Sequence, residues 1–113
     1  MDLLDEVADA ARLNCQLHSD DVAEMNGLLS ANERAEQLRL FAEGYGLDHP
    51  RRASLVDRMV ECGLRGAAYD CDEAGITPAA VGPHPMVWGV AWQARGAVWM
   101  LDHRELLERA LGV

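Results

Sequence analysis

Apolar residues recur at steps of three and four along much of the chain, which is the spacing of one face of an α-helix. Residues 2–17, 30–45 and 48–74 each show such a stripe. The apolar positions of the three stripes are Leu3, Leu4, Val7, Ala11 and Leu17, then Ala35, Leu38, Phe41, Ala42 and Tyr45, then Leu55, Val56, Met59 and Val60. We therefore predict three helices, each with one apolar face.

The second predicted helix has a signal at each end. Ser30 followed by Glu33 forms a capping box, in which the serine hydroxyl accepts a hydrogen bond from a first-turn amide and the glutamate reaches back to the serine amide. Gly44 and Gly46 can adopt the left-handed conformation that ends a helix. These signals place the helix between Ser30 and the glycine pair.

The third predicted helix begins directly after this stop. Asp48 or His49 can cap it, and Pro50 fits its first turn, where a missing amide proton costs little. The pattern continues to about Ala74. Gly63 weakens the helix by roughly 1 kcal/mol relative to alanine, so a break or kink near it is one alternative.

A short helix is predicted between the first two long ones. Ser19, Asp20 or Asp21 can supply its N-cap, and the apolar positions continue to about Met25. Asn26 and Gly27 then stop it.

The last third of the chain divides into a loop and two further helices. Residues 75–85 are rich in proline and glycine and predict a loop. Residues 86–101 are almost entirely apolar, so we expect them to form the most buried helix. One side of that helix is expected to hold Trp88, Trp92, Arg95 and Trp99. Asp102 with Glu105 resembles a cap that opens a final helix through Leu111.

Composition agrees with this pattern. Alanine and leucine, which favour helices, are abundant, and β-branched residues are few. A chain of 113 residues is long enough for one modest core. We therefore predict a single all-α domain over residues 1–113, with five or six helices.

The net charge of −9 narrows the choice of partners. Ten basic residues, all of them arginine, face nineteen acidic ones. Binding to a phosphate backbone needs a basic patch, so the charge argues against a nucleic-acid partner. It is compatible with a cationic small molecule, although a solvated acidic surface is the simpler explanation.

Cysteine usage and the N-terminus indicate the compartment. Three cysteines without Cys-x-x-Cys spacing disfavour a disulfide scaffold or a zinc site. The N-terminus is acidic, where a signal peptide would be basic. The apolar run over 86–101 is shorter than the ~20 residues that span a bilayer. We therefore expect a cytoplasmic protein that does not enter the membrane.

Candidate chemistry is sparse. Asp70, Asp72 and Glu73 flank Cys71, but carboxylates this close along one helix face different directions, so a solvated surface is a better explanation than a metal site. His84 lies between two prolines and is interpreted as a plain loop histidine, with a ligand contact as the alternative. The other histidines, His18, His49 and His103, lie near predicted helix starts, where capping explains them.

Part of the sequence resembles a known family. The run from Leu38 to Asp48 contains Tyr-Gly-Leu, and the helix after it contains Arg52, Leu55, Val56 and Asp57. This combination resembles the late helices of the aminoglycoside phosphotransferases, which are small-molecule kinases with a protein-kinase-like fold. The flanking segments 5–17 and 103–111 resemble other helices of the same lobe.

The resemblance implies the helical C-terminal lobe of a kinase-like phosphotransferase, without the N-lobe. The full-length family uses ATP and magnesium, but this chain has no lysine, no glycine-rich loop and no His-Gly-Asp motif. We therefore assign no catalytic, cofactor-binding, substrate-binding or metal residue. We expect an inactive, truncated C-terminal fragment of such an enzyme. The alternative is a non-enzymatic interaction module derived from that family, which would self-associate through its uncovered apolar faces.

Arg51 and Arg52 are the one candidate for anion binding that the sequence offers. They form an adjacent basic pair at a predicted helix start, where free amides and the helix dipole attract anions. A weak phosphate site is therefore conceivable here. A solvated helix start is the simpler interpretation.

Overall fold

The computed structural model describes residues 2–21, 27, 29–76 and 87–113. Within these ranges every regular element is a helix, so the predicted all-α class is confirmed. The helices are α1 (Leu3–Asn14), α3 (Ala31–Gly44), α4 (His49–Glu73), α5 (Val87–Asp102) and α6 (Arg104–Leu111).

The predicted helix ends around residues 30–50 are confirmed. The hydroxyl of Ser30 accepts a hydrogen bond from the Glu33 amide at 3.2 Å, and the Glu33 carboxylate accepts one from the Ser30 amide at 3.3 Å. Gly46, with φ of +66°, ends α3, whereas Gly44 remains helical. Asp48 caps α4 by accepting a hydrogen bond from the Arg51 amide at 3.0 Å. These local signals were sufficient to place both helices.

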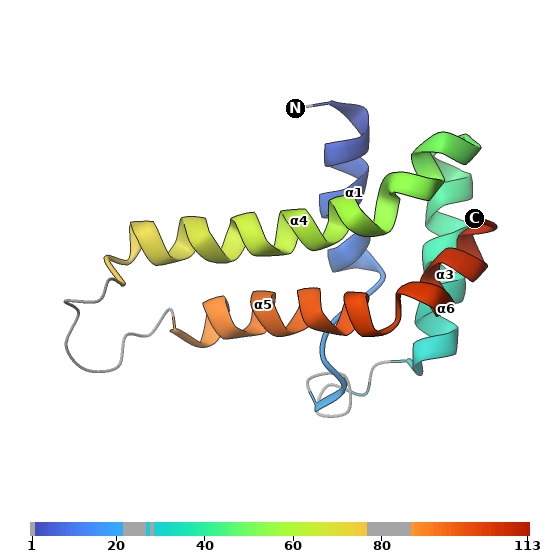
Figure 1. The fold of residues 1–113 in the computed structure, drawn as a ribbon. Coiled ribbons are helices and arrows are strands. Elements are labelled where there is room, and N and C mark those ends of the chain that lie inside the picture. Colours follow the sequence, from blue (N-terminus) through green and yellow to red (C-terminus); the bar gives the residue numbers. More distant parts are fainter. Residues whose placement is uncertain (1, 22–26, 28, 77–86) are drawn as a thin grey trace.

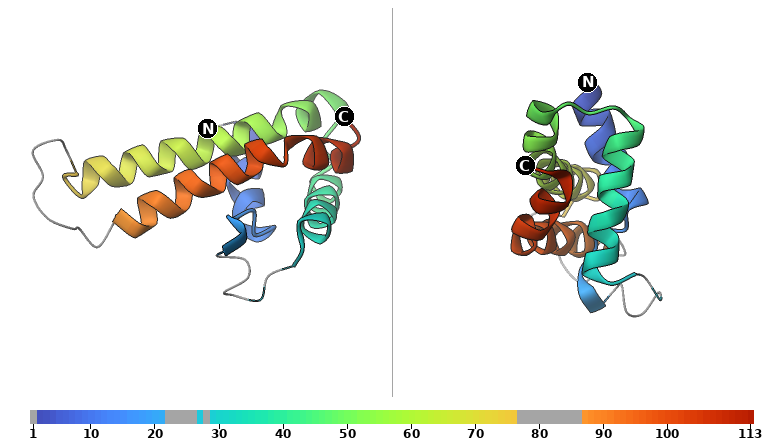
Figure 2. Two further views of the ribbon diagram at one scale, coloured as in Figure 1. Left: turned by 60° about the horizontal axis from the view of Figure 1, so that its bottom comes forward. Right: turned by 90° about the vertical axis from the view of Figure 1, so that its right-hand side faces the viewer.

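Helices α4 and α5 form the long axis of the molecule. They run antiparallel and side by side, and α1 packs against α4 (Figure 1). Helices α3 and α6 pack together where α4 begins and α5 ends. The other half of the α4–α5 pair projects beyond the remaining helices, as the left view of Figure 2 also shows. The molecule is therefore elongated, with extents of 46 × 32 × 19 Å.

The core lies at the end where all five described helices meet. The predicted α4 stripe is fully enclosed there, because Leu55, Val56 and Met59 have no exposed surface and Val60 is 8% exposed. The other helices contribute Val7, Ala8, Ala11, Leu38, Met100, Leu107 and Leu111. Burial of apolar surface at this end stabilises the arrangement by about 25 cal/mol per Å².

Gly63 allows α4 and α5 to approach closely. Helix α4 continues unbroken through it, so the suggested break does not occur. A β-carbon at this position would lie 3.5 Å from the Gln93 carbonyl oxygen and 3.6 Å from the Ala97 β-carbon. There is thus room for one methyl group and nothing larger. The close approach therefore requires a small residue at this position, and alanine would satisfy it as well as glycine.

The expectation that 86–101 would be the most buried helix is wrong. Trp99 is 4% exposed and Trp92 is half-buried, but Trp88 is 63% exposed. The reason is that the first half of α5 lies in the projecting part of the molecule, where α4 is its neighbour (Figure 1). An apolar helix with a neighbour on one side leaves its other side in solvent.

The remaining expectations on the fold have mixed outcomes. The short helix predicted to Met25 and the loop predicted at 75–85 lie largely outside the described residues, and Gly75 with φ of +67° ends α4. The single domain over 1–113 stays a prediction. Among the described helices, none combines the length and apolar character needed to cross a membrane.

Substitutions at Gly63 test the close approach of α4 and α5. We expect Gly63→Ala to raise the free energy of unfolding by up to ~1 kcal/mol, because the methyl group fits and alanine favours the helix. We expect Gly63→Leu to lower it by about 1–3 kcal/mol, because the larger side chain forces the helices apart. Urea unfolding followed by circular dichroism measures both. Equal stability of the two variants would contradict the packing described here.

Candidate functional site

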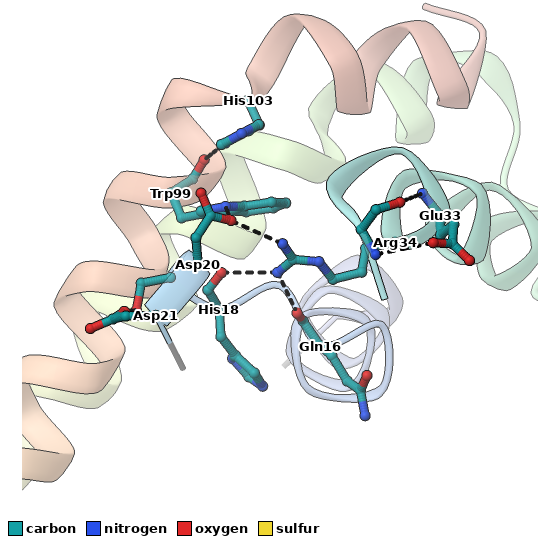
Figure 3. Close-up of polar contacts among 10 residues, drawn as sticks. Gln16, His18, Asp20, Asp21, Glu33, Arg34, Trp99 and His103 are labelled. Atoms are coloured by element: carbon teal, nitrogen blue, oxygen red, sulfur yellow. Dashed lines mark hydrogen bonds and ion pairs between the residues drawn. The ribbon is translucent and has the colours of Figure 1, made fainter. Parts of the chain in front are cut away.

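The buried side chain of Arg34 organises one side of the molecule. It lies in the first turns of α3 and is 2% exposed. One terminal guanidinium nitrogen donates hydrogen bonds to the carbonyl oxygens of Gln16 at 3.1 Å and His18 at 3.0 Å (Figure 3). The other donates to Oδ1 of Asp20 at 3.1 Å. The guanidinium therefore fixes the segment after α1 against α3.

Trp99 of α5 joins the same network. Its ring centroid lies 4.2 Å from the guanidinium carbon of Arg34, and its Nε1 donates a hydrogen bond to Oδ1 of Asp20 at 2.8 Å. The His103 ring stacks on the indole at 4.1 Å, on the opposite side from Arg34 in Figure 3. A cation above an indole face is electrostatically favourable. Trp99 is thus held in position by groups from three different segments.

Asp20 stays ionised within this network. The hydrogen bond from the Trp99 indole, followed by that from Arg34, holds the pKa of the Asp20 carboxyl below its usual range. The side chain is nevertheless 74% exposed, so solvent screens much of its interaction with Arg34. Asp20 therefore presents a negative charge at the surface beside Trp99.

A shallow hollow of about 330 Å³ lies next to this network. Three apolar side chains of α5 form part of its wall, namely Ala94, Val98 and Trp99. Polar groups from Ser19, Arg95 and Asp102 complete it. We refer to these six residues as the α5 hollow. An apolar wall with a few polar groups is typical of a small-ligand site.

The charges in and beside the α5 hollow are largely compensated. Arg95 pairs with Asp21, with 2.7 Å between its guanidinium nitrogen and Oδ2. The Ser19 hydroxyl donates a hydrogen bond to the same carboxylate at 2.7 Å. Asp102 differs, because its carboxylate makes no ion pair or hydrogen bond among the described residues. The hollow therefore presents one uncompensated negative charge beside an apolar wall.

A second groove, of about 570 Å³, lies between α1 and α4. Its charged side chains are all paired: Arg58 with Asp5, Arg65 with Glu61 at 2.7 Å, and Asp9 with Arg12, beside the groove, at 3.0 Å. Burial raises the pKa of the Cys62 thiol in its wall, so this cysteine is a poor nucleophile. The α1–α4 groove is accounted for by structural ion pairs.

The structure places the basic pair Arg51–Arg52 apart. Arg51 is exposed and lies 3.6 Å from Asp48. Arg52 donates a hydrogen bond to the carbonyl oxygen of Leu111 at 3.1 Å and so holds the end of α6. The two arginines therefore do not form a joint phosphate site.

The acidic cluster on α4 is also spread out. Asp70 accepts a hydrogen bond from Gln93 at 2.6 Å and so links α4 to α5, while Asp72 and Glu73 are exposed. In the part of the chain that the structure describes, no three His, Cys, Asp or Glu side chains gather as they would around a metal ion. His84 lies outside the described residues.

The capping explanation of the histidines is wrong for His49, because Asp48 caps α4, and for His103, whereas the short helix that His18 was expected to cap lies largely outside the described residues. His103 precedes α6, but its side chain makes no capping hydrogen bond and instead stacks on Trp99. His18 packs against Trp92, with 4.9 Å between the ring centroids. Asp102 does not cap α6 either, because it is the last residue of α5.

Sequence reasoning assigned no site residue and so missed the α5 hollow. Trp99 and Arg95 were noted as one side of a helix, but Ser19 and Asp102 were interpreted as caps. A signal for Arg34 was present, because it lies four residues before Leu38 and therefore on the apolar face of α3. A charged residue on an apolar face is rarely buried without specific partners.

A curated protein is similar to most of this chain. A trifolitoxin immunity protein of Rhizobium leguminosarum bv. trifolii is 44% identical over 106 residues, which make up 94% of the chain. The chain spans 40% of the length of that relative. No family model matches the chain, and no solved structure matches it.

This comparison overturns the expected relationship to aminoglycoside phosphotransferases. The relative is an immunity protein, so the interpretation as a phosphotransferase fragment, or as a module derived from that family, is wrong. The resemblance rested on the Tyr-Gly-Leu turn, on the start of the helix after it and on the two flanking helical segments. Gly46 supplies a left-handed turn after α3 and Asp48 caps α4, so these residues are explained by local backbone geometry.

Replacing Arg34 tests its role in the network. We expect Arg34→Met to lower the free energy of unfolding by roughly 2–4 kcal/mol, because the carbonyl groups of Gln16 and His18 lose their donors. The matched control is Arg65→Met at a side chain that is 78% exposed, where a change within about 0.5 kcal/mol is expected. Urea unfolding measures both. Similar losses in the two variants would show that Arg34 has no special role.

His18 makes the stability sensitive to mild acid. Burial, and then the charges of Arg34 and Arg12, lower the pKa of His18 in the folded protein from the ordinary value of 6.5. The unfolded chain therefore takes up a proton first as the pH falls below 6.5, so this contribution to stability is complete above that pH and is lost below it.

The pH dependence of unfolding tests this assignment. We expect the urea concentration at the unfolding midpoint to decrease as the pH is lowered from 7.5 to about 5.5. In His18→Gln this decrease should be smaller. His49→Gln, at an exposed position, serves as the control. An unchanged slope in His18→Gln would contradict the assignment.

Proposed function

We propose that this protein takes part in immunity to a toxin, as the curated relative is named for immunity to trifolitoxin. The observation that carries this proposal is 44% identity over 94% of the chain. The similarity extends over 106 of the 113 residues and is therefore not limited to one motif. The chain spans 40% of the length of the relative. We therefore also propose that this segment alone is enough to protect a cell against the toxin.

The features of the chain are compatible with this role. The α5 hollow offers a place for part of a ligand, and the proposal requires no ATP, metal or other cofactor. The net charge of −9 still argues against a nucleic-acid partner, and self-association stays a prediction.

The proposal places the protein in the cytoplasm. All three cysteines are free, as in a reducing compartment. Burial raises the pKa of the Cys15 thiol to about 11, which keeps this cysteine unreactive at neutral pH.

A protection assay tests the proposed function. A trifolitoxin-sensitive strain that expresses the 113-residue chain should grow at toxin concentrations that stop the strain carrying an empty vector. The full-length relative is the positive control, and an immunoblot confirms that the chain accumulates. Full sensitivity despite normal accumulation would overturn the proposal.

A further inference from the structure

We propose that the α5 hollow binds a cationic group attached to an apolar body, and that Asp102 is the residue that contacts the cation. This inference rests on the proposed immunity function, for which it names the ligand chemistry. It is drawn from three properties of the hollow: its wall, its charge balance and its position on α5.

The wall suits an apolar body of modest size. A volume of about 330 Å³ is at the lower end of small-ligand pockets, which range over roughly 300–1,000 Å³. Ala94 and Val98 project from consecutive turns of α5, and Trp99 is fixed by its contacts with Arg34, Asp20 and His103. A wall that is already ordered loses little conformational entropy when a ligand binds.

The charge balance selects a cation. Arg34 is paired with Asp20 and Arg95 with Asp21, so both arginines beside the hollow are already compensated. The Asp102 carboxylate lacks an ion-pair partner within the described ranges and is exposed. A cationic ligand group would gain a new ion pair there, whereas an anion would meet uncompensated negative charge. The net charge of the whole chain, −9, favours the same sign of ligand.

The position of Asp102 adds to this preference. It is the last residue of α5, and the C-terminal end of a helix carries a partial negative charge that attracts cations. The carboxylate and the helix end therefore act in the same direction at the same edge of the hollow. Because Val98 lies one turn before Asp102, a ligand can contact both at once.

Binding of a simple probe tests the ligand chemistry directly. We expect phenethylammonium to shift the NMR signal of the Trp99 indole N–H, and its neutral counterpart 2-phenylethanol to have a much weaker effect. Asp102→Asn should weaken phenethylammonium binding about two- to fivefold. The matched control Asp72→Asn removes one exposed carboxylate from α4 and should leave binding unchanged.

Three results of the binding experiment would overturn the inference. They are equal binding of the alcohol and the amine, unchanged affinity in Asp102→Asn, and shifts confined to the indoles of Trp88 and Trp92. Urea unfolding of both variants shows whether Asp102→Asn remains folded, which we expect because its carboxylate makes no internal contact among the described residues.

The protection assay separates this inference from the proposed function. Loss of protection in Asp102→Asn but not in Asp72→Asn, with equal accumulation, would support both. Full protection by Asp102→Asn would overturn the role of Asp102 and leave the immunity function in place. If the unmodified chain gives no protection, the immunity function falls, and selective binding of phenethylammonium at Trp99 still decides whether the hollow is a cation site.

Discussion

The burial of a single guanidinium group, that of Arg34, joins the segment after α1 to α3 and to Trp99 of α5. Its donors bind two backbone carbonyl groups and one carboxylate, and its central carbon lies 4.2 Å from the centroid of an indole ring. A lysine could not replace it, because a single ammonium group lacks the planar fork that reaches separate acceptors while stacking on a ring. Removing such a charge from water is costly, so its burial requires this many partners.

The acceptors of Arg34 are provided by the way in which α1 ends. Gln16 adopts a left-handed conformation with φ of +56°, which costs a non-glycine residue roughly 1–2 kcal/mol. The turn directs the carbonyl groups of Gln16 and His18 toward Arg34, and the hydrogen bonds offset the strain. The same turn brings Ser19 and Asp20 to α5. The α5 hollow therefore depends on Arg34 although Arg34 is not part of its wall.

The sequence predicted what is decided locally. The Ser30–Glu33 box, the Asp48 cap and the stripe of α4 each depend on residues within one or two turns, and all were confirmed. The exposure of Trp88 could not be predicted in this way, because it depends on which side of α5 finds a neighbour. An apolar helix looks the same in sequence whether one side or all sides are covered. The uniform apolar character of residues 86–101 therefore overstated their burial.

The same distinction explains why the function was misjudged. The motifs that suggested a phosphotransferase are a helix stop, a helix start and short apolar helical stripes, and such features occur in many helical proteins. The α5 hollow joins Ser19 to residues 94–102, and Asp20 bonds to Trp99 across 79 positions. No short motif can encode a contact of that range, because the fold must first bring the two segments together. A single carboxylate such as Asp102 can be recognised as a candidate site residue only in the folded protein. Its lack of a partner among the described residues is a property of the folded surface and not of the sequence around it.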